Sequence, residues 1–100
     1  MAVYAIALID IADRASYSKY EAGFMNIFMQ HNGRMLSVDE APVVKEGEWN
    51  YTRTVLIEFP DVQAFDGWYH SDAYQQLAQH RFGSASASIV VIKGLPSAPQ

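Results

Sequence analysis

The sequence contains more segments typical of β-strands than its helices can cover, and this imbalance constrains the fold more than any single motif. Four short segments have the pattern of strands, and at least three of them are apolar on both faces. Within residues 3–10, for example, one face reads Val, Ala, Ala and Ile and the other reads Tyr, Ile, Leu and Asp. Such a strand is usually buried on both sides. Only two helical segments are present, so one face of the predicted sheet needs a second protein surface.

The spacing of apolar residues places these elements along the chain. We expect strands at residues 3–10, 35–39, 52–59 and 87–93, with residues 43–44 as a minor strand in the long connection before the third. The first helix carries one continuous stripe at intervals of three or four positions, formed by Tyr17, Tyr20, Phe24, Ile27, Phe28 and His31. The second helix has Phe65, Trp68 and Tyr69 on its buried side.

Capping residues predict where the helices begin and end. Asp13 and Asp61 can each accept hydrogen bonds from the free N–H groups of a first helical turn. Ser71 can do the same, so we expect the second helix to break at residues 70–71. Gly33 stands where a left-handed C-terminal cap is expected. Gly23 interrupts the first helix at a cost of about 1 kcal/mol relative to Ala, and a close backbone contact there is one explanation for it.

The order β-α-β-β-α-β predicts an α+β, ferredoxin-like fold with a four-stranded antiparallel sheet and both helices on one face. The uncovered face would be a large apolar patch, which monomers avoid. Two sheets packed face to face bury it, and a stable interface needs about 800 Å² per subunit. We therefore predict a homodimer through the open sheet face. Residues 1–94 would form one domain, and residues 95–100 a flexible tail.

Composition argues against several classes of partner and site. The net charge is -4, and the seven Lys and Arg residues are spread along the chain, so neither nucleic acid nor an anionic membrane is an expected partner. The chain has no Cys, which excludes disulfides and thiolate metal sites. The apolar segment 3–9 is too short to span a bilayer and lacks the features of a signal peptide. We expect a cytoplasmic protein.

Several segments, in this order and spacing, resemble the DUF1330 family over about residues 3–94. They are Asp10, Asp13 and Tyr17; Gly33-Arg34; Glu46-Gly47-Glu48-Trp49 and Arg53; Glu58-Phe59-Pro60; Trp68-Tyr69, Ser71, Tyr74 and Arg81; and Ile89-Val90-Val91-Ile92 with Gly94. The sequence departs from the family pattern at His70, where Asn is common, and in the Ser/Ala-rich stretch 84–88.

The resemblance implies a dimeric α/β-barrel. The same fold serves cofactor-free monooxygenases, haem-degrading enzymes, lactone isomerases and stress-response proteins of unknown role. The family itself has no settled activity, so the resemblance strengthens the fold and leaves the function open.

Two arginines are candidates for holding an anionic ligand. Arg53 lies on an apolar strand face and needs an anionic partner there. It has opposite parity to Glu58, so the two should not pair. The alternative for Arg53 is an ion pair within the dimer, or a strand end that reaches solvent. Arg81 lies on the inner side of the last helix, where it could clamp an anion or anchor the next loop through backbone carbonyls.

A second group of candidates lies at the helix break and around the core. Tyr69, His70 and Ser71 sit together where free N–H groups would favour an anion. His70 or His31 could transfer protons near neutral pH; the alternatives are an exposed His beside an ordinary cap and a histidine at the core edge. Trp49, in the connection, could form a pocket lid or contact the partner subunit.

These residues support two hypotheses of different kinds. In the first, a cleft lined by Arg53, Tyr69, His70, Arg81 and Trp49 binds a small organic molecule, anionic or aromatic. Any chemistry there would be cofactor-free, with a His as base and an Arg holding an oxyanion. In the second, the protein is a non-enzymatic dimer whose polar residues are structural. It predicts that both arginines are satisfied by protein carboxylates or carbonyls.

A haem-binding relative is a third hypothesis, tested by the position of one His. Haem-degrading enzymes of this fold carry a His on the second helix, just after a Trp-x-x-Ser-Asp-like stretch. Matching that stretch to this chain puts Ala78 at the position of the His. His80 lies two residues on, about 200° around the helix, and would face away. The three His have no metal-ligand spacing, and we expect neither a metal nor a cofactor.

Overall fold

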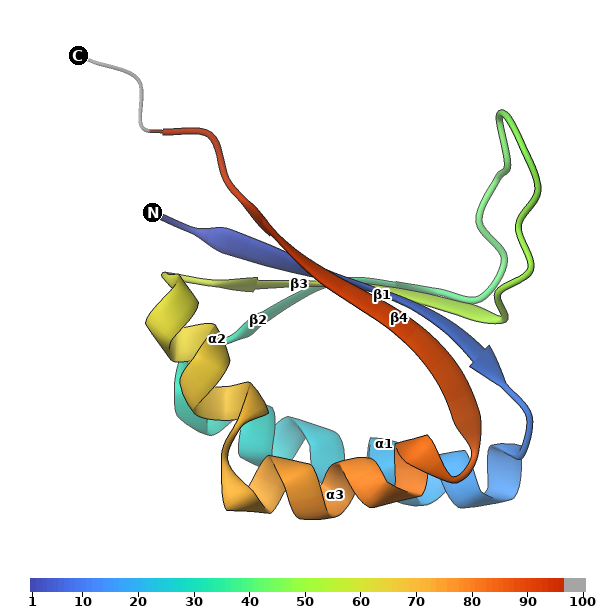
Figure 1. The fold of residues 1–100 in the computed structure, drawn as a ribbon, viewed down its shortest axis with the longest axis horizontal. Coiled ribbons are helices and arrows are strands. Elements are labelled where there is room, and N and C mark those ends of the chain that lie inside the picture. The colour runs from blue at the N-terminus through green and yellow to red at the C-terminus, as the bar shows by residue number, and fades with distance from the viewer. Residues whose placement is uncertain (97–100) are drawn as a thin grey trace.

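The computed structural model describes residues 1–96 of the chain and has the predicted order of strands and helices (Figure 1). The elements are β1 (Val3–Ile11), α1 (Arg14–Phe28), the short 3₁₀-helix η1 (Met29–His31), β2 (Arg34–Asp39), β3 (Arg53–Phe59), α2 (Val62–Tyr69), α3 (Asp72–Phe82) and β4 (Ala85–Lys93). The second predicted helix is therefore two helices, separated at the expected break.

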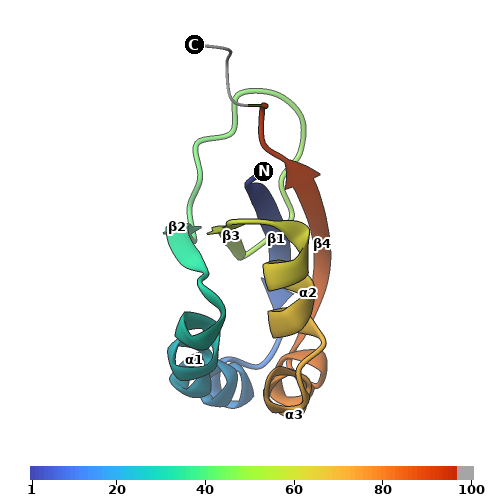
Figure 2. The same ribbon diagram turned by 90° about the vertical axis from the view of Figure 1, so that its left-hand side faces the viewer.

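The four strands form one antiparallel sheet in the order β2-β3-β1-β4, the ferredoxin-like topology that the sequence predicts. The helices lie on one face of this sheet, and the connection 40–52 extends on the opposite side (Figures 1 and 2). Register fixes which residues share a face: Ala5 pairs with Ile57 and Val91, whereas Ile6 pairs with Leu56 and Val90. A bulge in β2 between Met35 and Ser37 interrupts the pairing with β3.

The capping predictions are confirmed. Asp13 accepts from the Ser16 backbone N–H at 3.2 Å, and Asp61 accepts from that of Ala64 at 2.8 Å. Ser71 accepts from the Tyr74 N–H at 3.1 Å and so begins α3. Each cap satisfies one of the N–H groups that a helix start leaves free.

Two local predictions are wrong. The left-handed residue after α1 is Asn32, with φ of 63°, and not Gly33. Glycine is nevertheless needed at 33, because a Cβ there would collide with the ring of Phe28. The minor strand at residues 43–44 is absent from the described chain, because Val43 is 78% exposed and has no surface to pair with or pack against.

Each of the four strands differs from the prediction at one end, by one or two residues. The fourth strand begins at Ala85 rather than 87 because β1 continues to Ile11, which pairs with Ala85. The third begins at Arg53 because Thr52 uses its N–H to bond the Ile9 carbonyl at 2.8 Å. Gly94, the last residue before the predicted tail, donates to the Ala2 carbonyl at 2.8 Å, and residues 97–100 lie outside the described part of the chain.

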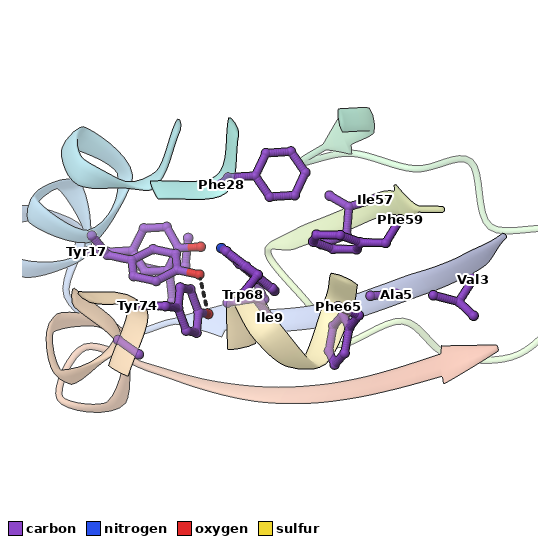
Figure 3. Packing of buried hydrophobic residues seen from close by; sticks show 13 residues of the cluster. Val3, Ala5, Ile9, Tyr17, Phe28, Ile57, Phe59, Phe65, Trp68 and Tyr74 are labelled. Carbon is purple, nitrogen blue, oxygen red and sulfur yellow. Dashed lines mark hydrogen bonds between the residues drawn. The ribbon is translucent and has the colours of Figure 1, made fainter. Parts of the chain in front are cut away.

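The core between helices and sheet is built mainly from aromatic side chains (Figure 3). Phe28 is fully buried and packs edge-on against Phe59 and Trp68, and Trp68 also contacts Tyr74 with ring centroids 4.2 Å apart. The close neighbour of Gly23 is a side chain and not backbone, because a Cβ there would lie 2.7 Å from a methyl carbon of Leu77 on α3. This approach lets α1 and α3 pack side by side under the sheet.

The face of the sheet without helices carries apolar side chains from three strands. Ile6 and Leu8 of β1, Leu56 of β3, and Val90 and Ile92 of β4 share this face by register. Val90 is 54% exposed, and Ile92 is similarly open to solvent. No helix within residues 1–96 has the length and apolar character needed to cross a membrane.

Candidate functional site

A pocket of about 190 Å³ lies between the helices and the inner face of the sheet. Its sheet side is formed by Ala5, Ala7, Ile9, Met35, Val38, Arg53, Val55, Ile57 and Ile89. Its helix side is formed by Tyr17, Tyr20, Glu21, Phe24, Met25, Phe65, Trp68, Tyr69, Tyr74 and Arg81. Most of these side chains are apolar or aromatic, as is usual for a site that binds a small organic molecule.

The pocket exists because β1 presents small residues to the helices. Ala5 and Ala7 occupy two successive inward positions, where a Leu or Ile would fill the space beneath α1 and α2. The large aromatic side chains of the helices then meet across a gap instead of packing onto β1. A strand of small inward residues between larger neighbours is thus the local cause of the cavity.

Exposure of the lining residues shows where the pocket opens. Glu21 and Met25 of α1 and Val38 of β2 are exposed, whereas Tyr74 and Trp68 on the opposite side are buried. The mouth therefore lies between α1 and β2, and the deep wall is formed by α2 and α3.

Three tyrosines line the deep part of the pocket. The hydroxyl oxygens of Tyr20 and Tyr74 are hydrogen-bonded to each other at 2.7 Å, and this bond is buried (Figure 3). Burial raises the pKa of Tyr20, and the neighbouring Tyr74 raises it further. Burial also raises the pKa of Tyr17. Tyr17 and Tyr20 are therefore neutral hydroxyl groups near pH 7, able to donate or accept hydrogen bonds but poor as bases.

Arg81 is a buried cation without a carboxylate partner in the described chain. The residue is only 4% exposed, and its Nε and Nη2 atoms have no hydrogen-bond partner within residues 1–96. Its guanidinium lies 4.8 Å from the ring centre of Phe82 and 5.7 Å from that of Tyr20, so aromatic faces offset part of the desolvation. Burial lowers the pKa of Arg81, but Tyr74 and Tyr20 beside it raise it, and the net direction is upward.

Arg81 does not anchor the loop before β4 through its side chain, which was the structural alternative for this residue. Ser84 anchors that loop instead. Its N–H donates to the Arg81 backbone carbonyl at 3.1 Å, and its own carbonyl accepts from Ala12 at 2.8 Å and Asp13 at 3.0 Å.

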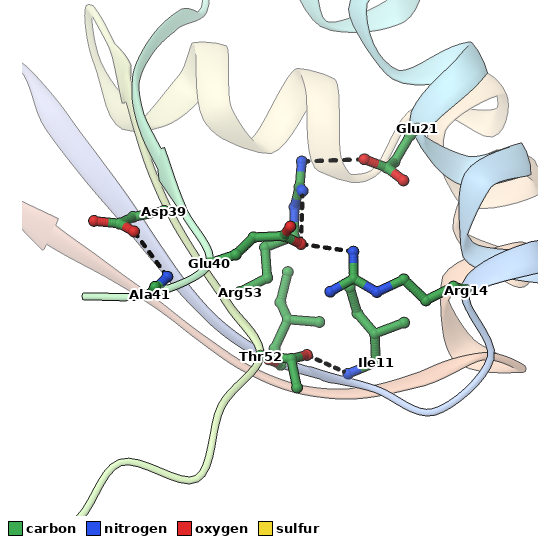
Figure 4. A network of polar contacts seen from close by, with 9 residues as sticks. Ile11, Arg14, Glu21, Asp39, Glu40, Ala41, Thr52 and Arg53 are labelled. Atoms are coloured by element: carbon green, nitrogen blue, oxygen red, sulfur yellow. Dashed lines mark hydrogen bonds and ion pairs between the residues drawn. The ribbon is translucent and has the colours of Figure 1, made fainter.

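Arg53, at the mouth, is in a different situation from Arg81. Its guanidinium lies 3.3 Å from a carboxylate oxygen of Glu21 and 3.4 Å from one of Glu40 (Figure 4). The same Glu40 oxygen is 2.7 Å from Arg14 on α1. Two cations and two anions thus form a mouth network, Arg14, Glu21, Glu40 and Arg53, that links α1 to the end of β2. As expected, Arg53 does not pair with Glu58, which lies 3.7 Å from Arg34 instead.

The structure brings together three of the residues predicted for a ligand site, namely Arg53, Tyr69 and Arg81, and separates the others from them. His70 is exposed at the C-terminus of α2. The Ser71 hydroxyl caps α3 by accepting from the Tyr74 N–H and donates to the Trp68 carbonyl at 2.8 Å. Neither residue lines the pocket.

Trp49 and His31 also lie outside the pocket lining. Trp49 packs edge-on against Tyr51, with ring centroids 5.2 Å apart, in the connection that extends away from the helices. It therefore cannot act as a lid on this pocket within one subunit. His31 ends η1, against α2.

Sequence reasoning missed the polar groups of four aromatic residues. Tyr17, Tyr20, Tyr74 and Trp68 were interpreted as core, which they are, but each also lines the pocket. Trp68 is 4% exposed, and its Nε1 has no acceptor within residues 1–96. The available signal was the choice of Tyr over Phe at three buried helical positions, because a buried hydroxyl needs a partner.

A metal centre is not indicated by the geometry. Across residues 1–96 no three His, Asp or Glu side chains come close enough together to hold an ion. His80 is exposed on α3, and Ala78, at the position compared above with a haem ligand, is fully buried.

Comparison with known proteins supports the fold. The sequence model of the DUF1330 family, described as a domain of unknown function, matches residues 2–95. RPA0582 of Rhodopseudomonas palustris, a protein of unknown function, is 16% identical with a TM-score of 0.80, over 95% of this chain and 83% of that one. No match was found among curated proteins.

Two further solved structures have the same fold. SnoaB of Streptomyces nogalater, a cofactor-independent oxygenase, is 10% identical with a TM-score of 0.70, over 99% of this chain and 98% of that one. A dimeric ferredoxin-like protein of unknown function from Jannaschia sp. CCS1 is 12% identical with a TM-score of 0.69, over 94% of this chain and all of that one. At these identities the similarity establishes the fold alone.

Proposed function

Since the chain belongs to the DUF1330 family, a family without an assigned activity, we propose its function from the pocket: a homodimer that binds a small organic anion between its helices and its sheet. The site would comprise Arg81 with Tyr20 and Tyr74 at the deep end, Tyr69 on the α2 wall, and Arg53 at the mouth. A cytoplasmic location, expected from the sequence, belongs to the same proposal.

The observation that carries this proposal is the state of Arg81. A buried cation usually has a carboxylate partner, because desolvation of an unpaired charge costs several kcal/mol. Arg81 has none within residues 1–96, and it lines a pocket. An anionic ligand would provide the missing charge. If the polar residues were purely structural, both arginines should have carboxylate or carbonyl partners in the protein, and only Arg53 has carboxylate partners within residues 1–96.

The homodimer would form through the open sheet face. Ile6, Leu56, Val90 and neighbouring apolar residues make this face unfavourable in water. The Jannaschia relative, described as dimeric, supports the same arrangement by analogy of fold. The connection 40–52 extends on this side of the sheet, so Trp49 would lie near the partner subunit.

Binding, rather than proton transfer by a histidine, is the function that this pocket supports. SnoaB is described as a cofactor-independent oxygenase, and a related chemistry would need a base at the site. His31 and His70 were the candidates, and neither lines the pocket. The one carboxylate in the lining, Glu21, is paired with Arg53 at 3.3 Å.

Native mass spectrometry of the gently purified protein tests the proposal directly. We expect a dimer that carries extra mass, and loss of that mass in the Arg81→Met variant. Lys19→Met removes an exposed cation of α1 and serves as the control with the same change in net charge. A bare wild-type protein that also takes up none of a panel of small organic acids would contradict the proposed ligand, and a monomer would contradict the dimer.

A further inference from the structure

Most of the buried side-chain donors without a partner belong to residues of the pocket; the exception within residues 1–96 is the Thr54 hydroxyl, on the open face of the sheet. Four side-chain N–H atoms are buried and have no acceptor within residues 1–96: Arg53 Nε, Trp68 Nε1, Arg81 Nε and Arg81 Nη2. All belong to residues that line the pocket. The Tyr20–Tyr74 pair adds a fifth donor, because two hydroxyl groups that share one hydrogen bond retain one O–H free to donate. The pocket is therefore matched to a ligand rich in acceptors, such as a carboxylate.

The charges around the pocket limit the charge of that ligand. In the mouth network, the charges of Arg14 and Arg53 are balanced by those of Glu21 and Glu40. Of the two arginines that line the pocket, only Arg81 has no carboxylate partner within residues 1–96. The site thus presents one net positive charge, and a second anionic group on the ligand would face Glu21 at the mouth.

The volume and the walls define the body of the ligand. A buried apolar cavity of about 150 Å³ is large enough to hold benzene, and this pocket measures about 190 Å³. Phe24, Phe65 and Tyr69 provide flat aromatic walls, with Phe65 and Tyr69 stacked at 5.6 Å, and Ala5 and Ala7 leave room above the sheet. One ring or two fused rings fit this shape, and aromatic faces favour an aromatic guest.

We infer that the ligand is a singly charged aromatic acid whose carboxylate lies at the deep end, between Arg81 and the Tyr20–Tyr74 hydroxyl pair. This assignment rests on the proposed ligand-binding function and specifies its chemical class. The indole N–H of Trp68 faces the tyrosine side of the core and contributes a further donor at that end (Figure 3). The ring lies toward the mouth, over Ala5 and Ala7. Arg53 is paired with Glu21 and Glu40 in the mouth network and does not bind the carboxylate of the ligand.

Three compounds of one shape test the charge assignment by calorimetric titration of the full chain. They are 2-naphthoate, the neutral 2-naphthamide and the doubly charged naphthalene-2,6-dicarboxylate. Charge-assisted hydrogen bonds are about twice as strong as neutral ones, so we expect 2-naphthoate to bind at least about tenfold more tightly than either analogue. Arg81→Met should weaken binding of the acid more than binding of the amide and so remove that preference, whereas Arg53→Met should keep the preference. Lys19→Met is again the control.

Other outcomes overturn the assignment in distinguishable ways. Equal affinity for acid and amide, or tighter binding of the dicarboxylate, would exclude a singly charged acid while leaving a retained ligand, and hence the proposed function, intact. Binding of none of the three would exclude an aromatic acid of this size. If Arg81→Met fails to fold, Trp68→Phe keeps the aromatic ring and removes one donor, and a loss of about threefold for 2-naphthoate alone supports the assignment. An equal loss for acid and amide would contradict it.

Discussion

The two faces of the sheet differ in the size of their apolar residues and in what covers them. On β1, the residues that face the helices include Ala5 and Ala7, whereas those on the open face include Ile6 and Leu8. The helix-covered face therefore has too little side-chain volume and contains a pocket, while the open face has more apolar surface than one subunit can cover. Because successive side chains of β1 point to opposite faces of the sheet, this one strand leaves space for the pocket on one side and contributes to an association surface on the other.

The largest expected effect comes from a charge on the open face. Val90 pairs with Ile6 on this face, so Val90→Lys would place two cations in a symmetric dimer interface. Burying an unpaired charge is strongly unfavourable, and we expect the dissociation constant of the dimer to rise at least about 1,000-fold. Analytical ultracentrifugation should then show a folded monomer at micromolar concentration.

The adjacent residue provides the matched control. Val91 pairs with Ala5 on the helix side of the same strand and is partly exposed at the sheet edge, so Val91→Lys introduces the same charge on the other face. It should leave the dimer intact. If both variants, or neither, change the mass in solution, the contrast between the two faces does not determine assembly.

The second effect tests the covered face by removing its space. Ala7→Leu adds three carbon atoms that point into the pocket, and we expect it to weaken ligand binding about tenfold or more while leaving thermal stability equal or higher. Ala73→Leu, on the exposed side of α3, adds the same atoms outside the pocket. Unchanged affinity in Ala7→Leu would show that the ligand binds elsewhere.

Much of the fold could be predicted because its signals are local. Asp13, Asp61 and Ser71 each cap a helix by accepting from the backbone N–H three residues later in the chain. The two apolar faces of a strand can likewise be recognised from the residues of that strand alone. Prediction failed where two local solutions compete. Asn32 and Gly33 can each adopt the left-handed conformation that follows a helix. Asn32 adopts it, and Gly33 is required for another reason, because the ring of Phe28 occupies the space that a side chain at residue 33 would need.

The site was less predictable because its chemistry depends on contacts that are distant in sequence. Arg53, on a strand, and Arg81, on a helix, were equal candidates for a ligand site, and what distinguishes them is that Glu21 and Glu40 reach only Arg53. The helix break around His70 has the residue types of a site, but only Tyr69 lines the pocket, and His70 and Ser71 do not. Residue types therefore identified the candidate site residues. Which of them remain available for a ligand depends on the protein side chains that contact them in three dimensions.

The third effect concerns the cost of Arg81 on the covered face. Its charge is uncompensated in the described chain, so Arg81→Met should raise the free energy of unfolding of the ligand-free protein by about 1 kcal/mol. Chemical denaturation of wild type and variant, both freed of ligand, measures this difference. A decrease of similar size would mean that the contacts with Phe82 and Tyr20 outweigh the desolvation, which would favour a structural role for Arg81.

The smallest effect comes from the mouth network and depends on pH. The hydrogen bond from Arg14 and the positive charges of Arg14 and Arg53 hold the pKa of Glu40 below its ordinary value of 4.5. A carboxylate whose pKa is lowered on folding contributes stability above its unfolded pKa and loses it as the pH falls through the folded value. Glu40→Gln should therefore lower the melting temperature slightly at pH 7, and the difference from wild type should vanish in acid below pH 4.5.

High salt should also reduce this difference, because the network is exposed and screened by solvent ions. Glu46→Gln is the matched control, since Glu46 forms no ion pair within residues 1–96. A Glu40→Gln effect of the same size at pH 7 and in acid would show that its carboxylate charge does not stabilise the mouth. Glu40 would then not stabilise the charge of Arg53. Glu21 alone would neutralise Arg53 at the mouth and so distinguish it from the uncompensated Arg81 at the deep end.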